Sequence, residues 1–81
     1  MRLDKFLKVS RLIKRRTVAN SVSESGRVLV NGNVAKPAKQ LNVGDIIEIE
    51  FSGHTERYEV LIVPSGNVSI QEAQTLYKVL G

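Results

Sequence analysis

The sequence of 81 residues contains no cysteine and no tryptophan, and it has only two prolines and four aromatic residues. The absence of cysteine excludes disulfide scaffolds, thiolate zinc sites and cysteine nucleophiles. No apolar run is long enough to cross a membrane, and the charged N-terminus does not have the pattern of a secretory signal. We therefore expect a cytoplasmic protein that does not bind membranes.

The length fits one compact domain rather than two, because a domain usually needs on the order of 100 residues to bury a core. Hydrophobic residues make up 42% of the chain and charged residues 25%, which is typical of a folded protein. No repeat, low-complexity tract or linker divides the sequence. We expect a single domain over residues 1–81 and a monomer.

The charges are segregated along the chain. Residues 1–40 contain ten basic and two acidic side chains, a net charge of +8, whereas residues 41–81 have a net charge of −4. A polyanion is therefore attracted to the N-terminal half. Phe6, Phe51 and Tyr58 are expected in the core, so few aromatic rings remain to stack single-stranded bases. The pattern favours a folded RNA that is recognised by its shape.

The spacing of apolar residues predicts two helices in the first 26 residues. A first helix is expected to start near Leu3 and to end near Ser10, where the helical spacing loosens. Thr17 is expected to cap a second helix, and Gly26 is placed to end it in a left-handed conformation. The predicted order is helix, bend, helix.

Beyond Gly26 the apolar period changes to two, which is typical of strands. Asn31 and Gly32 form the strongest short signal for a hairpin turn, and Phe51 and Ile62 are expected to face inward from two later strands. A capping-box spacing at 69–72 and an apolar stripe that extends to Leu80 predict a closing helix. The expected fold is α+β: two N-terminal helices packed on a small, mostly antiparallel β-sheet, with a short C-terminal helix.

Few residues have the pattern of a catalytic or cofactor site. His54, the only histidine, falls in an expected hairpin tip without a second metal-ligating side chain. Glu48 and Glu50 share one strand face, where a solvated surface is a simpler reading than an acid and base pair. No Gly-rich phosphate loop is present. We expect no enzyme activity, no metal and no cofactor.

Basic residues recur at every third position from Arg2 to Lys14 and continue as Arg15 and Arg16. On one straight helix a step of three residues falls back by about 60°, so the set would wrap around the helix. A bend near Ser10 would instead let two groups converge on one surface. Arginine can hold two phosphate oxygens or stack on a base, so the arginines are the expected sources of selectivity.

Asp4 is the only acidic residue inside this basic segment. A carboxylate in the first turn of a helix stabilises the helix dipole. An equally acceptable role for Asp4 is to orient Arg2 or a nearby lysine, and the sequence leaves both readings open.

Five segments carry a family resemblance: RLDKFL at 2–7, the Ser10 and Arg11 pair, RVLVNG at 27–32, AKPAK at 35–39 and VGDIIEI at 43–49. Together they resemble the RNA-binding domain named after small-subunit ribosomal protein S-four, also called the alpha-L motif, with a motif core over about residues 2–51. The resemblance implies an RNA-binding surface on the two helices and the following turn. Its residues would be Arg2, Asp4, Lys5, Lys8, Arg11, Lys14, Arg15, Arg16, Asn31, Lys36 and Lys39.

The chain is most similar to stand-alone members of this family that associate with ribosomes, which are of a quality-control type and a heat-shock type. The quality-control resemblance implies binding to an obstructed large ribosomal subunit, with contacts to ribosomal RNA and peptidyl-tRNA. It also implies support for a partner factor that adds C-terminal alanine tails to stalled chains. Two alternatives within RNA binding remain: recycling of free large subunits that carry nascent chains, and generic ribosomal RNA binding or ribosome assembly. A third alternative is a protein-interaction module that uses the acidic sheet face around Glu48, Glu50 and Glu59.

Overall fold

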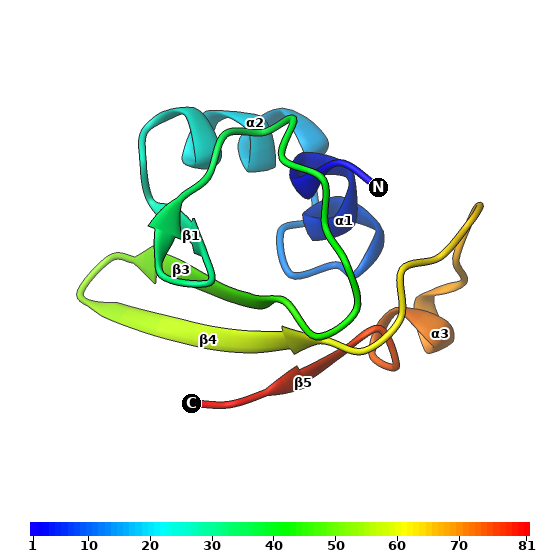
Figure 1. Cartoon of the computed structure of the whole chain (residues 1–81). Coiled ribbons are helices and arrows are strands. Elements are labelled where there is room, and N and C mark those ends of the chain that lie inside the picture. The colour runs from blue at the N-terminus through cyan, green and yellow to red at the C-terminus, as the bar shows by residue number, and fades with distance from the viewer.

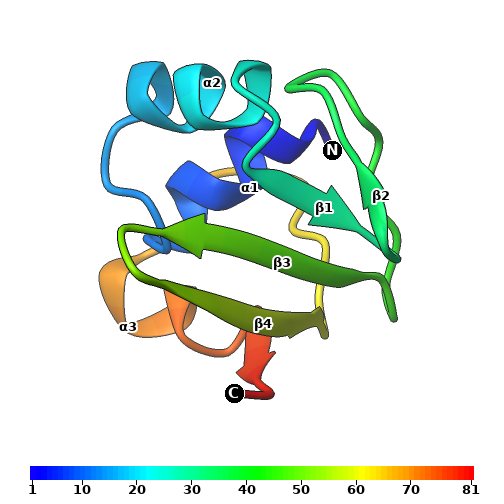
Figure 2. The same cartoon turned by 90° about the vertical axis from the view of Figure 1, so that its left-hand side faces the viewer.

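The computed structural model describes residues 1–81 and has two N-terminal helices on one side of a five-stranded antiparallel sheet (Figures 1 and 2). The strands are β1 (Val28–Val30), β2 (Asn33–Val34), β3 (Ile46–Phe51), β4 (His54–Val60) and β5 (Tyr77–Val79), and their order in the sheet is β2-β1-β3-β4-β5. The expected α+β class is confirmed. No helix combines the length and the apolar character that crossing a membrane requires.

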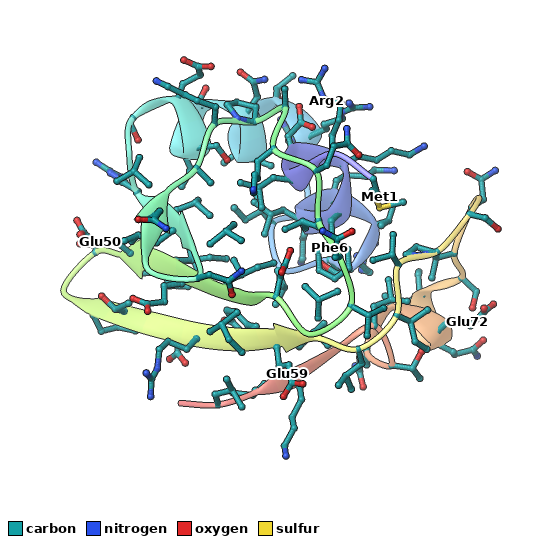
Figure 3. The ribbon with its side chains drawn as sticks, in the orientation of Figure 1. Met1, Arg2, Phe6, Glu50, Glu59 and Glu72 are labelled. Carbon is teal, nitrogen blue, oxygen red and sulfur yellow. The ribbon has the colours of Figure 1, made fainter.

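Helix α1 (Leu3–Val9) packs its apolar face against the sheet. Leu3, Phe6 and Leu7 fall on one side of the helix at spacings of three and four residues, and all three are fully buried. Figure 3 shows Phe6 in the interior of the molecule. The helix ends as expected: Ser10 is its C-cap, and Arg11 then adopts a left-handed conformation with φ of 62°. This turn provides the predicted bend between the helices.

Helix α2 (Arg16–Glu24) crosses above α1 in Figure 2. The prediction that Thr17 caps this helix is wrong, because Arg16 is already helical and the extended residue before it, Arg15, is the N-cap. No side chain caps this end. The other end follows the prediction: Gly26 has φ of 82°, and the Arg27 N–H donates to the carbonyl of Val22 at 3.2 Å.

The hairpin between β1 and β2 turns at Asn31 and Gly32, whose φ values are 53° and 84°, as the sequence predicts. The inner face of the sheet contributes Val28, Val30, Ile47, Ile49, Tyr58 and Val60 to a cluster of 14 buried hydrophobic residues. Two inward placements differ from the prediction. Strand β4 ends at Val60, which leaves Ile62 47% exposed, and Phe51 at the end of β3 is only half-buried.

The closing helix is shorter than predicted. Helix α3 (Ile70–Ala73) is one turn long, and the capping side chain of Ser69 accepts from the Glu72 N–H at 3.2 Å. The stripe predicted to continue to Leu80 instead becomes β5, because Tyr77 and Val79 alternate and pair with β4. Alternating aromatic and β-branched residues favour a strand, and this pairing satisfies the backbone groups of β4.

Candidate RNA-binding surface

The buried carboxylate of Asp4 is the centre of a partly exposed polar cluster that joins α1 to α2. Its Oδ1 atom accepts from Arg2 Nε at 3.1 Å, from Arg16 Nη2 at 3.4 Å and from the Lys5 backbone N–H at 2.8 Å. Its Oδ2 atom accepts from Arg2 Nη2 at 3.3 Å and from Asn20 Nδ2 at 3.4 Å. Asp4 is 2% exposed and lies in the first turn of α1, where it contacts both a first-turn N–H and Arg2, so the two roles that the sequence left open are compatible.

Burial alone would raise the pKa of the Asp4 carboxyl group, because a charged group is less stable away from water. The hydrogen bonds from Arg2, Asn20 and Arg16 outweigh this effect, and the pKa of Asp4 lies below its ordinary value. The carboxylate is therefore charged at neutral pH. It holds the two guanidinium groups, whose side chains remain about half exposed, at fixed positions on the surface.

Beside this cluster the surface has a shallow hollow of about 320 Å³. It is lined by Asp4, Arg16, Thr17 and Asn20. Sequence reasoning did not select Thr17 or Asn20 as site residues. The spacing of Arg16 and Asn20 by one helical turn was the available signal, because residues four apart share a helix face.

The remaining basic residues between Arg2 and Arg16 lie on α1 and on the bend that leads to α2. Lys5 and Lys8 are exposed on α1, and Arg11, Lys14 and Arg15 are exposed in the loop that leads to α2. The structure therefore places the seven predicted basic residues of this segment on the two helices and the bend between them. Arg2 and Arg16 are the pair that it brings into direct contact with a common partner.

The segment at 36–39 lies against the N-terminal end of α1, as the views in Figures 1 and 2 agree. The backbone N–H groups of Leu3 and Asp4 donate to the carbonyls of Lys39 and Pro37 at 2.8 and 3.1 Å. These bonds satisfy donors that a helix leaves free in its first turn. Lys36 and Lys39 are exposed, and Lys36 Nζ lies 3.9 Å from a carboxylate oxygen of Glu24 on α2.

Asn31 has a different environment from the basic residues. Its Nδ2 atom donates to Asp45 Oδ1 at 3.1 Å, and its Oδ1 atom accepts from the Ile46 N–H at 2.9 Å. The Asp45 carboxylate also accepts from the Asn42 N–H at 2.8 Å. The Asn31 side chain thus ties the hairpin turn to the start of β3, a structural role that sequence reasoning did not foresee.

The outer face of the sheet does not form a uniformly acidic surface. Glu48 on β3 is directly opposite Arg57 on β4, and Glu59 on β4 is directly opposite Lys78 on β5. Opposite charges at such positions attract each other across the strands. The sequence gives residues 41–81 a net negative charge, but on this face of the sheet its acidic side chains alternate with basic ones.

The family model for the S4 domain matches residues 1–47, the part of the chain that holds both helices and the first hairpin. The chain is 53% identical to a Halalkalibacterium halodurans protein named RQC P-site tRNA stabilizing factor, covering 98% of this chain and 89% of that one. It is 31% identical to a Heat shock protein 15 homolog of Haemophilus influenzae, covering 96% of this chain and 60% of that one.

Among solved structures, the trimeric structure of Vibrio cholerae Heat Shock Protein 15 is similar over 98% of this chain and 80% of that chain, with a TM-score of 0.87 and 32% sequence identity. The similarity in fold and the similarity in sequence indicate the same class of protein. The chain belongs to the S4 domain family, and within that family it is related over nearly its whole length to proteins named RQC P-site tRNA stabilizing factor.

Proposed function

We propose that this protein binds large ribosomal subunits that are obstructed by peptidyl-tRNA and that it contacts both ribosomal RNA and the tRNA. In this role it supports the C-terminal alanine tailing of stalled nascent chains by a separate factor on the same subunit. The name of the Halalkalibacterium relative supports the tRNA part of this proposal. The protein acts as a cytoplasmic, ribosome-associated monomer.

The observation that carries the proposal is the pair of arginines that Asp4 fixes on a two-helix platform. Each guanidinium has five N–H donors, of which Arg2 uses two and Arg16 uses one on Asp4. The remaining donors are available to phosphate oxygens. Because the Asp4 carboxylate already restricts the conformations of the two arginines, binding costs less side-chain entropy. A preorganised pair favours one geometry of the RNA backbone over others.

The proposed mechanism is positional and non-catalytic. The basic surface holds ribosomal RNA and the tRNA backbone together, so that the tRNA stays in place while residues are added without a small subunit. Phosphate contacts give affinity and fix orientation, and they require no bond to be made or broken. The exposed lysines of α1 and of the bend add general attraction for the polyanion.

A heat-shock type of role, recycling of free large subunits that carry nascent chains, is the second candidate. The structural similarity to Vibrio cholerae Heat Shock Protein 15 favours it. The sequence identity favours the quality-control role, because the chain is 53% identical to the stabilizing factor and 31% identical to the Heat shock protein 15 homolog. A generic ribosomal RNA binder would share the same charges but would bind naked duplexes about as well as subunits.

The test is sedimentation of the purified protein with three samples: small subunits, large subunits, and large subunits that carry peptidyl-tRNA. The proposal predicts enrichment on the tRNA-bearing large subunit. It also predicts a steep loss of affinity with salt, with each phosphate contact contributing about 0.7–0.9 to the log–log slope. Equal binding to all three samples would leave a generic RNA binder, and binding to none would refute the proposal.

A further inference from the structure

A second groove lies at the C-terminal end of α1, away from the Asp4 cluster. It has a volume of about 230 Å³, and it is lined by Lys8, Val9, Arg11, Asn67, Val68 and Ile70. None of these residues lines the hollow beside Asp4. One wall is formed by α1 and the bend that follows it. The other wall is formed by residues 67–70, the C-terminal segment that leads into α3. In Figure 2 the chain that leaves α1 passes close to α3.

The two basic residues of the groove have no acidic partner. The ion pairs of the structure use Arg2, Arg16, Lys36 and His54, so no carboxylate lies within 4 Å of the charged groups of Lys8 and Arg11. Both side chains are exposed. Two uncompensated positive charges at one groove attract an anion, and they disfavour a purely apolar occupant.

Arg11 occupies its place at the edge of this groove in a left-handed conformation, with φ of 62°. A residue with a Cβ atom is less stable in this conformation than glycine is, and such positions cluster at functional sites. The sequence therefore has an arginine at a position where glycine would form the same bend with less strain. A bound anion gives that arginine a function.

The opposite wall of the groove contains two apolar side chains and one amide. Ile70 is 68% exposed, the largest exposed fraction among the exposed large hydrophobic residues of the chain, and the neighbouring Val68 packs partly against the core. Asn67 is also exposed and adds an amide with hydrogen-bond donors and an acceptor. A phosphate group alone would leave this wall without a partner, whereas a phosphate with its attached ribose would cover it.

We propose that the groove binds one phosphate of an RNA strand together with its ribose. The phosphate pairs with Lys8 and Arg11, and the carbon face of the ribose packs on Ile70. The Asn67 amide is placed to hydrogen-bond a ribose hydroxyl, a group that distinguishes RNA from DNA. The inference rests on the proposed function and gives the C-terminal segment, which lies outside the matched residues 1–47, a part in RNA binding.

The test compares two substitutions that introduce the same carboxylate at adjacent positions. Ile70→Glu places a carboxylate in the groove, and Gln71→Glu places the same charge on the adjacent exposed residue, which does not line the groove. Binding is measured to large subunits that carry peptidyl-tRNA, over a range of salt concentrations. We expect Ile70→Glu to weaken binding about tenfold more than Gln71→Glu, a loss typical of one charge-assisted contact.

A second pair of variants separates a local contact from the total charge. Lys8→Gln removes a lysine from the groove, and Lys78→Gln removes one from the outer face of the sheet. We expect the salt slope to fall by about 0.7–0.9 for Lys8→Gln and to stay near the wild-type value for Lys78→Gln. All four positions are exposed, and melting temperatures near that of the wild type verify that each variant is folded.

The outcomes separate this inference from the function on which it rests. If Ile70→Glu binds as well as Gln71→Glu and Lys8→Gln behaves like Lys78→Gln, the groove does not contact RNA, although the protein still binds the subunit. If the wild-type protein itself does not bind the subunit, the proposed function fails instead.

Discussion

Arg2 and Arg16 donate to the same oxygen atom, Oδ1 of Asp4, with nitrogen–oxygen distances of 3.1 and 3.4 Å. Arg2 is the N-cap of α1 and Arg16 is the first residue of α2, so the shared carboxylate fixes one helix start relative to the other. The positive charges at the start of α2 oppose its helix dipole. Asp4 offsets part of this repulsion, and a bound phosphate would offset the rest.

Replacing Asp4 by asparagine tests the cluster directly. The substitution keeps the volume but removes the charge that holds both arginines, so we expect a loss of about 1–2 kcal/mol in the free energy of unfolding. This figure is modest because the guanidinium groups are half exposed and water screens them. Affinity for the large subunit should also fall, since Arg2 and Arg16 would no longer be preorganised.

The matched control is Glu50→Gln, which neutralises an exposed carboxylate on β3. Urea unfolding should show a change below about 0.5 kcal/mol for this variant, as is usual for surface substitutions. Equal stability losses for Asp4→Asn and Glu50→Gln would contradict a structural role for the Asp4 cluster.

The lowered pKa of Asp4 predicts how stability depends on pH. In the unfolded chain the carboxyl group titrates near its ordinary value of 3.8, and in the folded protein it titrates at a lower pH. The stabilisation by Asp4 is therefore complete above pH 3.8 and is lost as the pH falls through the folded pKa. Unfolding of the wild type and of Asp4→Asn should be compared at several pH values. Their difference in stability should narrow below pH 3.8, and a constant difference would refute the assignment.

Two substitutions of Asn31 separate its backbone conformation from its side-chain bonds. Asn31→Gly removes the hydrogen bonds to Asp45 and Ile46 but tolerates the positive φ, so we expect a loss of about 1 kcal/mol. Asn31→Ala removes the same bonds and, unlike glycine, keeps a Cβ atom in the left-handed conformation. We therefore expect a larger loss, about 2 kcal/mol in the free energy of unfolding. Thermal unfolding measures both losses. Equal losses for the two variants would show that the backbone conformation contributes little.

Arg11→Gly is expected to weaken RNA binding without lowering the stability of the fold. Glycine adopts the φ of 62° without strain, so the melting temperature should stay the same or rise slightly. Binding to the large subunit should weaken, because the variant removes one of the two cations of the groove beside Ile70. A lower melting temperature together with unchanged binding would assign Arg11 a structural role instead.

Local signals in the sequence predicted most of the fold. Glycine at the end of α2 and the Asn31 and Gly32 pair each require positive φ, and few backbone arrangements satisfy that requirement. The prediction of a longer C-terminal helix failed because apolar residues after α3 belong to a strand. Their spacing along the sequence does not distinguish a continuing helix from a helical turn followed by a strand. Pairing with β4, a tertiary interaction, decided that Tyr77–Val79 extends the sheet.

The candidate site was predicted less completely than the fold. Periodicity placed the basic residues on the first helix and the bend, but it did not show that Asp4 is buried or that Arg16 meets Arg2 there. That contact depends on how α1 and α2 cross. The role of Asn20 depends on the same crossing, as does the hollow beside it.

The most direct test of the central claim is a pair of charge reversals at two arginines. Arg16→Glu reverses a residue of the Asp4 cluster, and Arg57→Glu makes the same change on the outer face of the sheet. Both variants would be sedimented with large subunits that carry peptidyl-tRNA, and circular dichroism would verify their folds. We predict that Arg16→Glu abolishes binding and keeps the circular dichroism spectrum of the folded protein, with a melting temperature lowered by the new carboxylate beside Asp4. Arg57→Glu should bind almost as the wild type does. Equal binding by the two folded variants would contradict the claim that the Asp4 cluster forms the RNA-binding surface.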